Sequence, residues 1–257
     1  EHAAAARLVA GGTDIVVELS RGIRPTATLI DITRISELRG ISDRDGVITL
    51  GALTTHNDVL GSALCREQLA PLAEACWEVG APQIRSRGTI TGNLVTASPA
   101  NDTITPLIAL EAELVLTSAR GERTLPLRDF YLGVRRTALA PDELVREIRI
   151  PAMTPNQRGR FVKLGLRRAQ AISVIDLAIV LTFDGDLVSD ARIALGALAP
   201  TIVRAEAAEA ALRGHSLSAE VCQRVAELAD EVVSPIDDVR ATAPYRRRTL
   251  QNLIAAT

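Results

Sequence analysis

Two adjacent glycines near the start of the chain are the first residues that suggest chemistry. A strand-type run over residues 7–10 ends at Gly11-Gly12, and a helical segment over 15–21 follows. Paired glycines permit a turn with positive φ and let a ligand approach the backbone amides closely. Amide N–H groups beside a helix N-terminus bind anions, and a diphosphate suits such a site. The same turn also occurs as a plain tight connection, so both interpretations stay open at this point.

A second polar stretch covers residues 84–102 and is rich in glycine, serine and threonine. Its weak periodicity predicts a long loop, and long loops inside compact domains usually bind something. Asp102 then stands where it would cap an apolar helix over 104–112. With few acids or bases around the two polar turns, a bound cofactor is expected to carry the chemistry, and no residue is assigned a catalytic role.

The sequence indicates no metal site and no common nucleotide motif. Its histidines and cysteines are widely spaced and include no CxxC pair. They are His2, His56, His215, Cys65, Cys76 and Cys222. His56 falls at an expected helix start, where a structural role is favoured. The patterns G-x-x-x-x-G-K-[ST] and G-x-G-x-x-G are missing, which argues against a P-loop and a Rossmann site. Arg167-Arg168 is either a solvated pair or a ligand-facing one.

Composition sets broad limits on the class of protein. The chain has 257 residues, of which 47% are hydrophobic and 23% charged, so it predicts a globular protein of two domains. Aromatic residues make up only 2%, so the core is expected to be aliphatic. A net charge of -2 gives no reason to expect a nucleic-acid partner. Apolar runs stay short of the roughly 20 residues that a membrane span needs. The few cysteines favour a reducing, cytoplasmic location.

The first part of the chain predicts an α+β arrangement. Strands over 7–10 and 27–32 around the helix 15–21 indicate a small βα unit with parallel strands. A mixed or antiparallel sheet is expected next, because residues 144–150 alternate cleanly and a hairpin is indicated over 114–127. Further elements are a strand over 47–53 and helices over 55–65 and 71–79. These segments predict an N-terminal domain over 1–152; since no Met opens the chain, truncation at its start stays open.

The second part predicts a separate, smaller domain over 159–257. Residues 151–158, with Pro151 and Pro155, form the best linker candidate. Three strands follow, and the turn Asp184-Gly185-Asp186 joins the last two as a hairpin. The strands cover 160–166, 173–183 and 191–198, and helices are expected over about 202–213, 218–233 and 244–255. The prediction is a three-stranded antiparallel sheet under a helical layer.

These motifs together resemble a known family, the FAD-binding medium subunits of the molybdenum hydroxylases. Xanthine dehydrogenase and carbon monoxide dehydrogenase belong to that family. The matching segments are 8–15, 51–56, 89–94, 97–102, 144–151 and 163–168, in the family's order along nearly the whole chain. The combination is specific, although each piece alone would be weak.

The resemblance implies that FAD is held between a two-subdomain N-terminal domain and the C-terminal domain. The loop over residues 8–15 would wrap the diphosphate, a second loop would contact the cofactor, and apolar residues would pack on the flavin. The implied cofactor-binding residues are Leu8, Val9, Ala10, Gly11, Gly12, Thr13, Asp14, Ile15, Val79, Thr89, Gly92, Asn93, Ser98, Asp102, Val145 and Lys163. Because a carboxylate is unfavourable beside phosphates, Asp14 is expected to cap the following helix.

Two departures from the family pattern affect the expected site. Thr91 stands where the family usually has a glycine, and a β-branched residue narrows the allowed backbone there. After Arg167-Arg168 this chain has Ala169-Gln170-Ala171, where many relatives carry acidic residues near the flavin. The flavin potential and any NAD pocket are therefore expected to differ.

The resemblance implies an electron-transfer role within a larger complex. A molybdenum subunit would oxidise the substrate, a 2Fe–2S subunit would relay the electrons, and FAD would pass them to an acceptor such as NAD, quinone or oxygen. The molybdenum cofactor and the clusters would belong to those partner subunits only. Two alternatives remain: a stand-alone FAD-dependent oxidase, and a scaffold subunit that has lost FAD.

Overall fold

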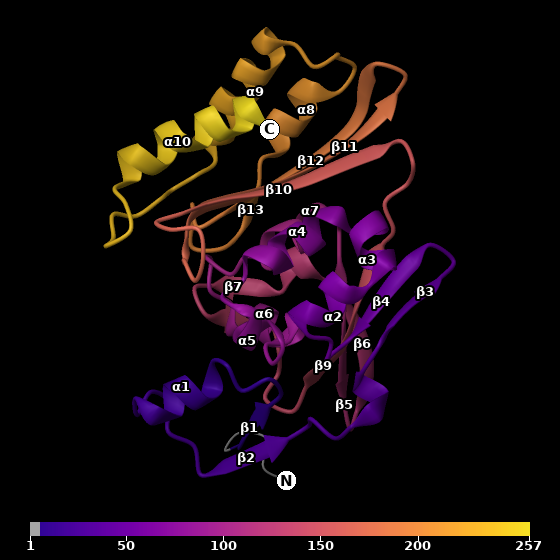
Figure 1. Cartoon of the computed structure of the whole chain (residues 1–257), viewed down its shortest axis with the longest axis vertical. Coiled ribbons are helices and arrows are strands. Elements are labelled where there is room, and N and C mark those ends of the chain that lie inside the picture. The colour runs from indigo at the N-terminus through magenta and orange to yellow at the C-terminus, as the bar shows by residue number, and fades with distance from the viewer. Residues whose placement is uncertain (1–5) are drawn as a thin grey trace.

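The computed structural model describes residues 6–257, so the first five residues of the expected 1–152 domain lie outside it. Three layers follow one another along the long axis of the molecule (Figure 1). A small N-terminal unit lies at one end, a sheet with its helices in the middle, and the C-terminal sheet with its helices at the other end. The expected α+β class with two N-terminal subdomains is confirmed.

The N-terminal unit has the predicted parallel arrangement. Strand β1 (Ala6–Val9) pairs in parallel with β2 (Thr28–Asp31), and helix α1 (Ile15–Ser20) connects them. Gly22 ends the helix region with a φ of 67°, and its N–H donates to the Leu19 carbonyl at 3.0 Å. The short 3-10 helix η1 (Ser36–Leu38) then leads into the next subdomain. Short-range sequence signals were therefore enough to predict the arrangement of this unit.

The second subdomain is built on a five-stranded antiparallel sheet with the order β3-β4-β9-β5-β6. The strands are β3 (Ile41–Arg44), β4 (Val47–Gly51), β9 (Leu144–Pro151), β5 (Glu113–Ser118) and β6 (Gly121–Pro126). Helices α2 (His56–Gly61), α3 (Ala63–Gln68), α4 (Ala70–Glu78) and α7 (Ile104–Ala109) share its aliphatic core. Strand β3 was not predicted, because its sequence Ile-Ser-Asp-Arg is polar and mostly exposed.

The polar stretch 84–102 was wrongly predicted to be one long loop. It contains helix α6 (Ile90–Thr96), and helix α5 (Pro82–Arg85) ends just inside it. Thr89 caps α6 by accepting a hydrogen bond from the Gly92 N–H at 3.0 Å, and the left-handed residue Ala97 ends the helix. Because Ile90 and Leu94 point into the core, packing stabilises a helix that short-range composition does not favour.

The C-terminal part has a four-stranded antiparallel sheet, with the order β10-β11-β12-β13, where three strands were predicted. The strands are β10 (Gln157–Gly165), β11 (Ser173–Asp184), β12 (Leu187–Gly196) and β13 (Val203–Arg204). The two-residue β13 occupies the start of the helix predicted from 202. Helices α8 (Glu206–Leu212), α9 (Ala219–Glu231) and α10 (Ala243–Ala256) form the predicted helical layer. The turn at 184–186 joins β11 to β12 as expected.

Both faces of the C-terminal sheet are buried. Ile175 and Leu177 pack toward α8–α10, whereas Ala178 and Val180 belong to the core that contains α4 and α7. The N–H of Phe161 donates to Glu74 of α4 at 2.7 Å across this contact. Of the expected linker 151–158, only residues 152–156 lie outside strands. The two parts of the chain therefore share one continuous apolar contact instead of being joined by a linker alone.

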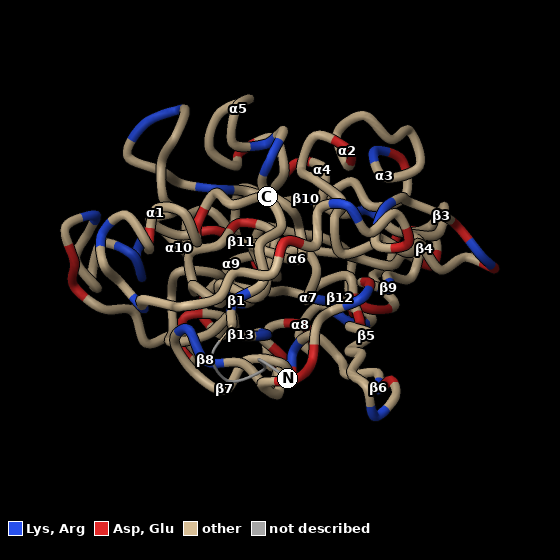
Figure 2. Tube along the Cα trace, turned by 90° about the horizontal axis from the view of Figure 1, so that it is seen from below, with Lys and Arg blue, Asp and Glu red and all other residues tan. Residues whose placement is uncertain are grey.

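Basic and acidic segments are interspersed along the trace (Figure 2). Two short strands, β7 (Tyr131–Gly133) and β8 (Arg136–Thr137), pair antiparallel after the 3-10 helix η2 (Leu127–Asp129). Among residues 6–257, no helix is both long enough and apolar enough to pass through a bilayer.

Candidate functional site

A cleft of about 590 Å³ lies between the N-terminal unit and the second subdomain. The turn after β1 forms one wall, and the residues around the start of α6 form the opposite wall. Most of the predicted site residues line this cleft, namely Leu8, Ala10, Gly11, Gly12, Thr13, Asp14, Ile15, Val79, Thr89, Gly92 and Asn93. Segments that lie some 80 residues apart in the sequence thus meet at one cavity.

Close backbone packing requires glycine residues at this turn. A Cβ on Gly11 would lie 2.0 Å from the Arg87 carbonyl oxygen, which no rotamer change could relieve. Gly12 has a φ of 82°, in the left-handed region that favours glycine. Within residues 6–257, the N–H groups of Gly11, Gly12, Thr13 and Asp14 donate to no protein acceptor. The turn therefore presents a row of free donors beside the N-terminus of α1.

The opposite wall is held in place by hydrogen bonds to neighbouring elements. Thr55 and Thr89 form an isolated antiparallel bridge, and the His56 N–H donates to the Gly88 carbonyl at 3.2 Å. The Thr103 hydroxyl donates to the Asn93 side-chain oxygen at 2.6 Å. This contact fixes which end of the Asn93 amide is the oxygen. The NH₂ group at the other end remains available as a donor at the cleft.

A buried ion pair lies directly behind the cleft wall formed by Val79. Lys163 Nζ donates to Asp102 Oδ2 at 2.6 Å, and the two side chains are only 4% and 8% exposed. The same ammonium donates to the carbonyl of Glu78, next to Val79, at 3.2 Å. Burial raises the pKa of Asp102, and the Lys163 charge opposes that shift. A cation is thus fixed beside Glu78, the residue that precedes Val79 of the cleft wall.

Both parts of the chain match models of flavoprotein domains. Residues 1–153 match the family model "FAD binding domain in molybdopterin dehydrogenase", and residues 160–257 match "CO dehydrogenase flavoprotein C-terminal domain". The carbon monoxide dehydrogenase medium chain of Hydrogenophaga pseudoflava is 36% identical over 94% of this chain and 84% of its own length. The chain belongs to the FAD-binding medium subunits of the molybdenum hydroxylases.

Further relatives agree with this family assignment. The nicotinate dehydrogenase FAD-subunit of Eubacterium barkeri is 32% identical over 96% of this chain and 84% of its own length. A solved carbon monoxide dehydrogenase from Hydrogenophaga pseudoflava superposes with a TM-score of 0.95, covering 98% of this chain and 88% of that one, at 36% identity. As a medium subunit, the chain is part of an oxidoreductase and carries an FAD-binding domain.

The cleft of this medium subunit fits FAD in its donor chemistry. The free N–H row from Gly11 to Asp14 suits the acceptor-rich diphosphate, and Val79 offers an apolar wall for a flat ring. The other predicted site residues, which are Val9, Ser98, Asp102, Val145 and Lys163, lie outside the cleft lining. Val145 is buried in the core, 4% exposed, and Asp102 and Lys163 form the pair behind the wall.

Two predicted capping roles are wrong. Asp14 is at the N-cap position of α1, but its side chain accepts no capping hydrogen bond. Burial, and then the neighbouring Glu18, raise the pKa of Asp14, so its carboxyl is held in an unfavourable place for a charge. Asp102 does not cap α7, because its oxygens accept from Lys163 and from the Ser173 hydroxyl at 2.6 Å instead. Partners distant in the sequence outcompete the local cap.

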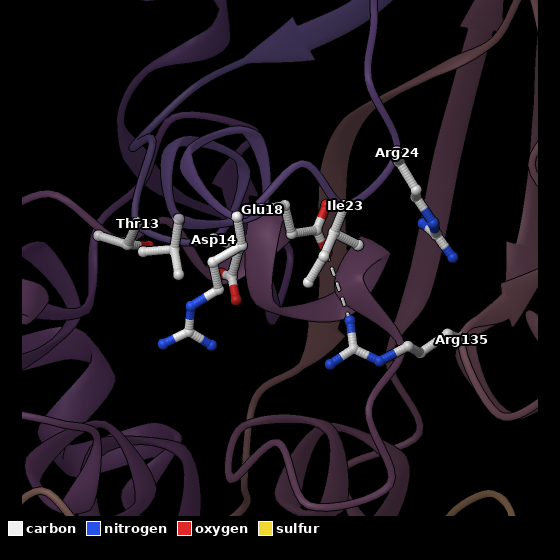
Figure 3. Close-up of a pocket in the computed structure, with 8 residues that line it drawn as sticks. Thr13, Asp14, Glu18, Ile23, Arg24 and Arg135 are labelled. Atoms are coloured by element: carbon white, nitrogen blue, oxygen red, sulfur yellow. Dashed lines mark hydrogen bonds and ion pairs between the residues drawn. The ribbon is translucent and has the colours of Figure 1, made fainter.

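Several arginines of the medium subunit's cleft were missed by sequence reasoning. Glu18 of α1 binds Arg7 and also Arg135, the latter at 3.4 Å, and Arg24 completes the group. Figure 3 shows Glu18, Arg24 and Arg135 around an adjoining cavity of about 480 Å³, with the Arg135–Glu18 contact dashed. Arg135 and Glu18 are 117 positions apart, so no local motif could have paired them.

His56, which also lines the cleft, predicts a specific pH dependence of stability. Burial, assisted by the charge of Arg85, lowers the pKa of His56 from 6.5 to about 4. The unfolded chain therefore binds a proton before the folded chain does, and stability is lost as the pH falls from about 6.5 toward 4. Between pH 7 and pH 5 this linkage amounts to about 2 kcal/mol.

The measurement is the free energy of unfolding in denaturant at the two pH values. We expect His56→Gln to remove about 2 kcal/mol of the pH effect seen in the wild type. The matched control is His215→Gln, because His215 is exposed and should leave the pH effect unchanged. Equal pH effects in wild type and His56→Gln would show that the imidazole titrates normally.

Proposed function

We propose that this chain binds FAD in the cleft and passes electrons from a 2Fe–2S subunit through the flavin to an external acceptor. A molybdenum-containing large subunit would oxidise the substrate. Bound FAD supplies the redox chemistry, since flavins accept and donate one or two electrons. The observation that carries the proposal is the row of free N–H donors from Gly11 to Asp14, residues that line a cleft in a matching FAD-binding domain.

The chain's own residues would bind and orient the cofactor. The amides of residues 8–15 would hold the diphosphate, and Thr89, Gly92 and Asn93 would contact it from the opposite wall. Val79 would pack against the isoalloxazine, with Val145 and Ser98 supporting the site from behind. The Lys163–Asp102 pair would set the electrostatic field behind the wall at Val79. No acid–base role is required of any of them.

The proposed partners are a 2Fe–2S small subunit and a molybdopterin large subunit, with NAD or another acceptor outside the complex. Relatives named as a medium chain and as an FAD-subunit support a place in a multi-subunit enzyme. We also propose a cytoplasmic location, supported by the free thiols of Cys65, Cys76 and Cys222 in the part of the chain that the structure describes.

Flavin binding tests the proposal directly. The purified full chain is incubated with FAD, separated from free cofactor, and examined for a flavin absorption spectrum and for FAD released on denaturation. We expect a stoichiometric flavin and no oxidation of small substrates by the chain alone. Native circular dichroism together with no bound flavin would support the scaffold alternative and end this proposal. Substrate oxidation by the isolated chain would favour the stand-alone oxidase.

A further inference from the structure

Asp176 of β11 is a buried carboxyl without a cation of its own. It is 1% exposed and faces α7 at the contact between the two parts of the chain. The Thr105 hydroxyl donates to its Oδ1 at 2.5 Å, while Oδ2 has no hydrogen-bond partner among residues 6–257. A carboxylate buried in this way is strongly unfavourable, because it loses its hydration without gaining a counter-charge.

The backbone of Gly196 seals this carboxyl from solvent. A Cβ at position 196 would lie 2.1 Å from Asp176 Oδ1 and 2.5 Å from the Thr105 hydroxyl. Gly196 is also the antiparallel partner of Asp176 across β11 and β12. The close contact leaves no room for water beside Oδ1. Asp176 must therefore satisfy its charge within the protein or remain neutral.

The ammonium of Lys163, whose charge acts on Asp176, is already used by another carboxylate. Lys163 of β10 pairs with Asp102 at 2.6 Å, so these two charges cancel. The Ser173 hydroxyl donates its single proton to Asp102 Oδ1 at 2.6 Å. Ser173 also adjoins the Asp176 carboxyl, and a hydrogen bond donated by Ser173 would lower the pKa of Asp176. Because the single hydroxyl proton is given to Asp102, the Ser173 oxygen can act toward Asp176 only as an acceptor. Asp176 needs a proton of its own to make that contact favourable.

In the described part of the chain, the elements packed around Asp176 supply no other cation that could neutralise it. On α4, Glu78 adds negative charge and the Cys76 thiol is buried and neutral, with a raised pKa. Arg192 of β12 binds Glu111 at 3.0 Å. Beyond the sheet, Arg240 and Arg246 donate to backbone carbonyls of β11 and both pair with Asp238. Burial, followed by the Asp102 charge, raises the pKa of Asp176 to about 8.

We propose that Asp176 keeps a proton in the folded protein and donates it to Ser173, which in turn holds Asp102 against Lys163 behind the cleft. Asp176 is thus a positioning residue for the ion pair behind the wall of the cofactor site. The protonation of Asp176 stands on the geometry alone, whereas its effect on the cofactor rests on the proposed function. The hydrogen bonds run from Asp176 to Ser173 and from Ser173 to Asp102, and Lys163 donates to Asp102 from the other side.

Infrared spectroscopy and pH-dependent unfolding of the cofactor-free full chain test the proposal. At pH 7 the wild type should show a buried protonated-carboxyl band that D176N lacks. The control D129N, at an exposed aspartate with a 56% exposed side chain, should keep the band. Because folding raises the pKa of Asp176, the wild type should lose stability relative to D176N as the pH rises from about 4 to 8. The ratio of their unfolding constants should change about tenfold per pH unit.

The outcomes separate this proposal from the proposed function. A wild type without the band, or a constant stability difference between wild type and D176N over this pH range, would overturn the proton assignment. The wild-type band can be measured even if D176N fails to fold, so the proton assignment stays testable. With FAD added, wild-type affinity should fall as the pH passes 8, while D176N affinity stays level; parallel affinity curves would overturn the positioning role. A wild type that shows the band but binds no FAD at any pH refutes only the proposed function.

Discussion

Replacing Lys163 by methionine should destabilise the folded chain by about 3–5 kcal/mol at pH 7. Methionine preserves most of the side-chain length and apolar contact but removes the ammonium. Asp102, whose side chain is 8% exposed, would then be buried with only the Ser173 hydroxyl as a donor. Breaking a buried pair by removing one partner is costly because the remaining charge loses its compensation.

Denaturant unfolding of three variants measures this effect. The double variant K163M/D102N should recover much of the lost stability, since it removes both charges. The control is Arg120→Met, which breaks an exposed pair with Asp142 and should cost less than about 1 kcal/mol. If K163M and Arg120→Met were equally stable, the Lys163–Asp102 pair would have to be solvated.

The identity of the cation at position 163 is itself informative. Lys163 is the single lysine among the 29 basic residues of the chain, so arginine serves everywhere else. A compact ammonium can reach both Asp102 and the Glu78 carbonyl from one point, whereas a planar guanidinium needs more room. Lys163→Arg should therefore be less stable than wild type despite its conserved charge. This composition signal could have marked position 163 without any knowledge of the fold.

The elements that the sequence predicted well are those decided by short-range signals. The hairpin turn at 184–186 and the capping box from Thr55 to Asp58 are complete within a few residues. Strand β3 and helix α6 were missed because their stability comes from neighbours, through pairing with β4 and through the burial of Ile90 and Leu94. Tertiary packing overrides local preference in both cases.

The same division holds for the candidate site. The glycine turn could be predicted, because positive φ and close approach leave a recognisable local pattern. The role of Asp102 could not, since its partners Lys163 and Ser173 are 61 and 71 positions away. A residue beside a helix start looks like a cap until its distant partner is known. Residues whose function depends on long-range pairing therefore need the structure.

Replacing Gly11 by alanine should weaken FAD binding at least about tenfold, or about 1.4 kcal/mol. The new Cβ would overlap the Arg87 carbonyl oxygen at 2.0 Å, a backbone atom that cannot rotate away. The turn must then move away from the opposite wall of the cleft, and its row of N–H donors moves with it. Overpacking of this kind also costs about 1–3 kcal/mol of folding stability. Equilibrium titration with FAD and denaturant unfolding measure the two effects separately.

A matched glycine distinguishes this steric requirement from the general effect of removing a glycine. Gly61 lies in helix α2, and a Cβ there would meet nothing within 4 Å beyond its chain neighbours and the backbone of its own helix. Gly61→Ala should therefore bind FAD like the wild type and gain up to about 1 kcal/mol of stability from the less flexible unfolded chain. If Gly11→Ala bound FAD equally well, the close contact with Arg87 would be irrelevant to the cofactor. The contrast between the two alanines thus isolates what the first glycine of the pair contributes: the approach of two backbones that together form the cleft.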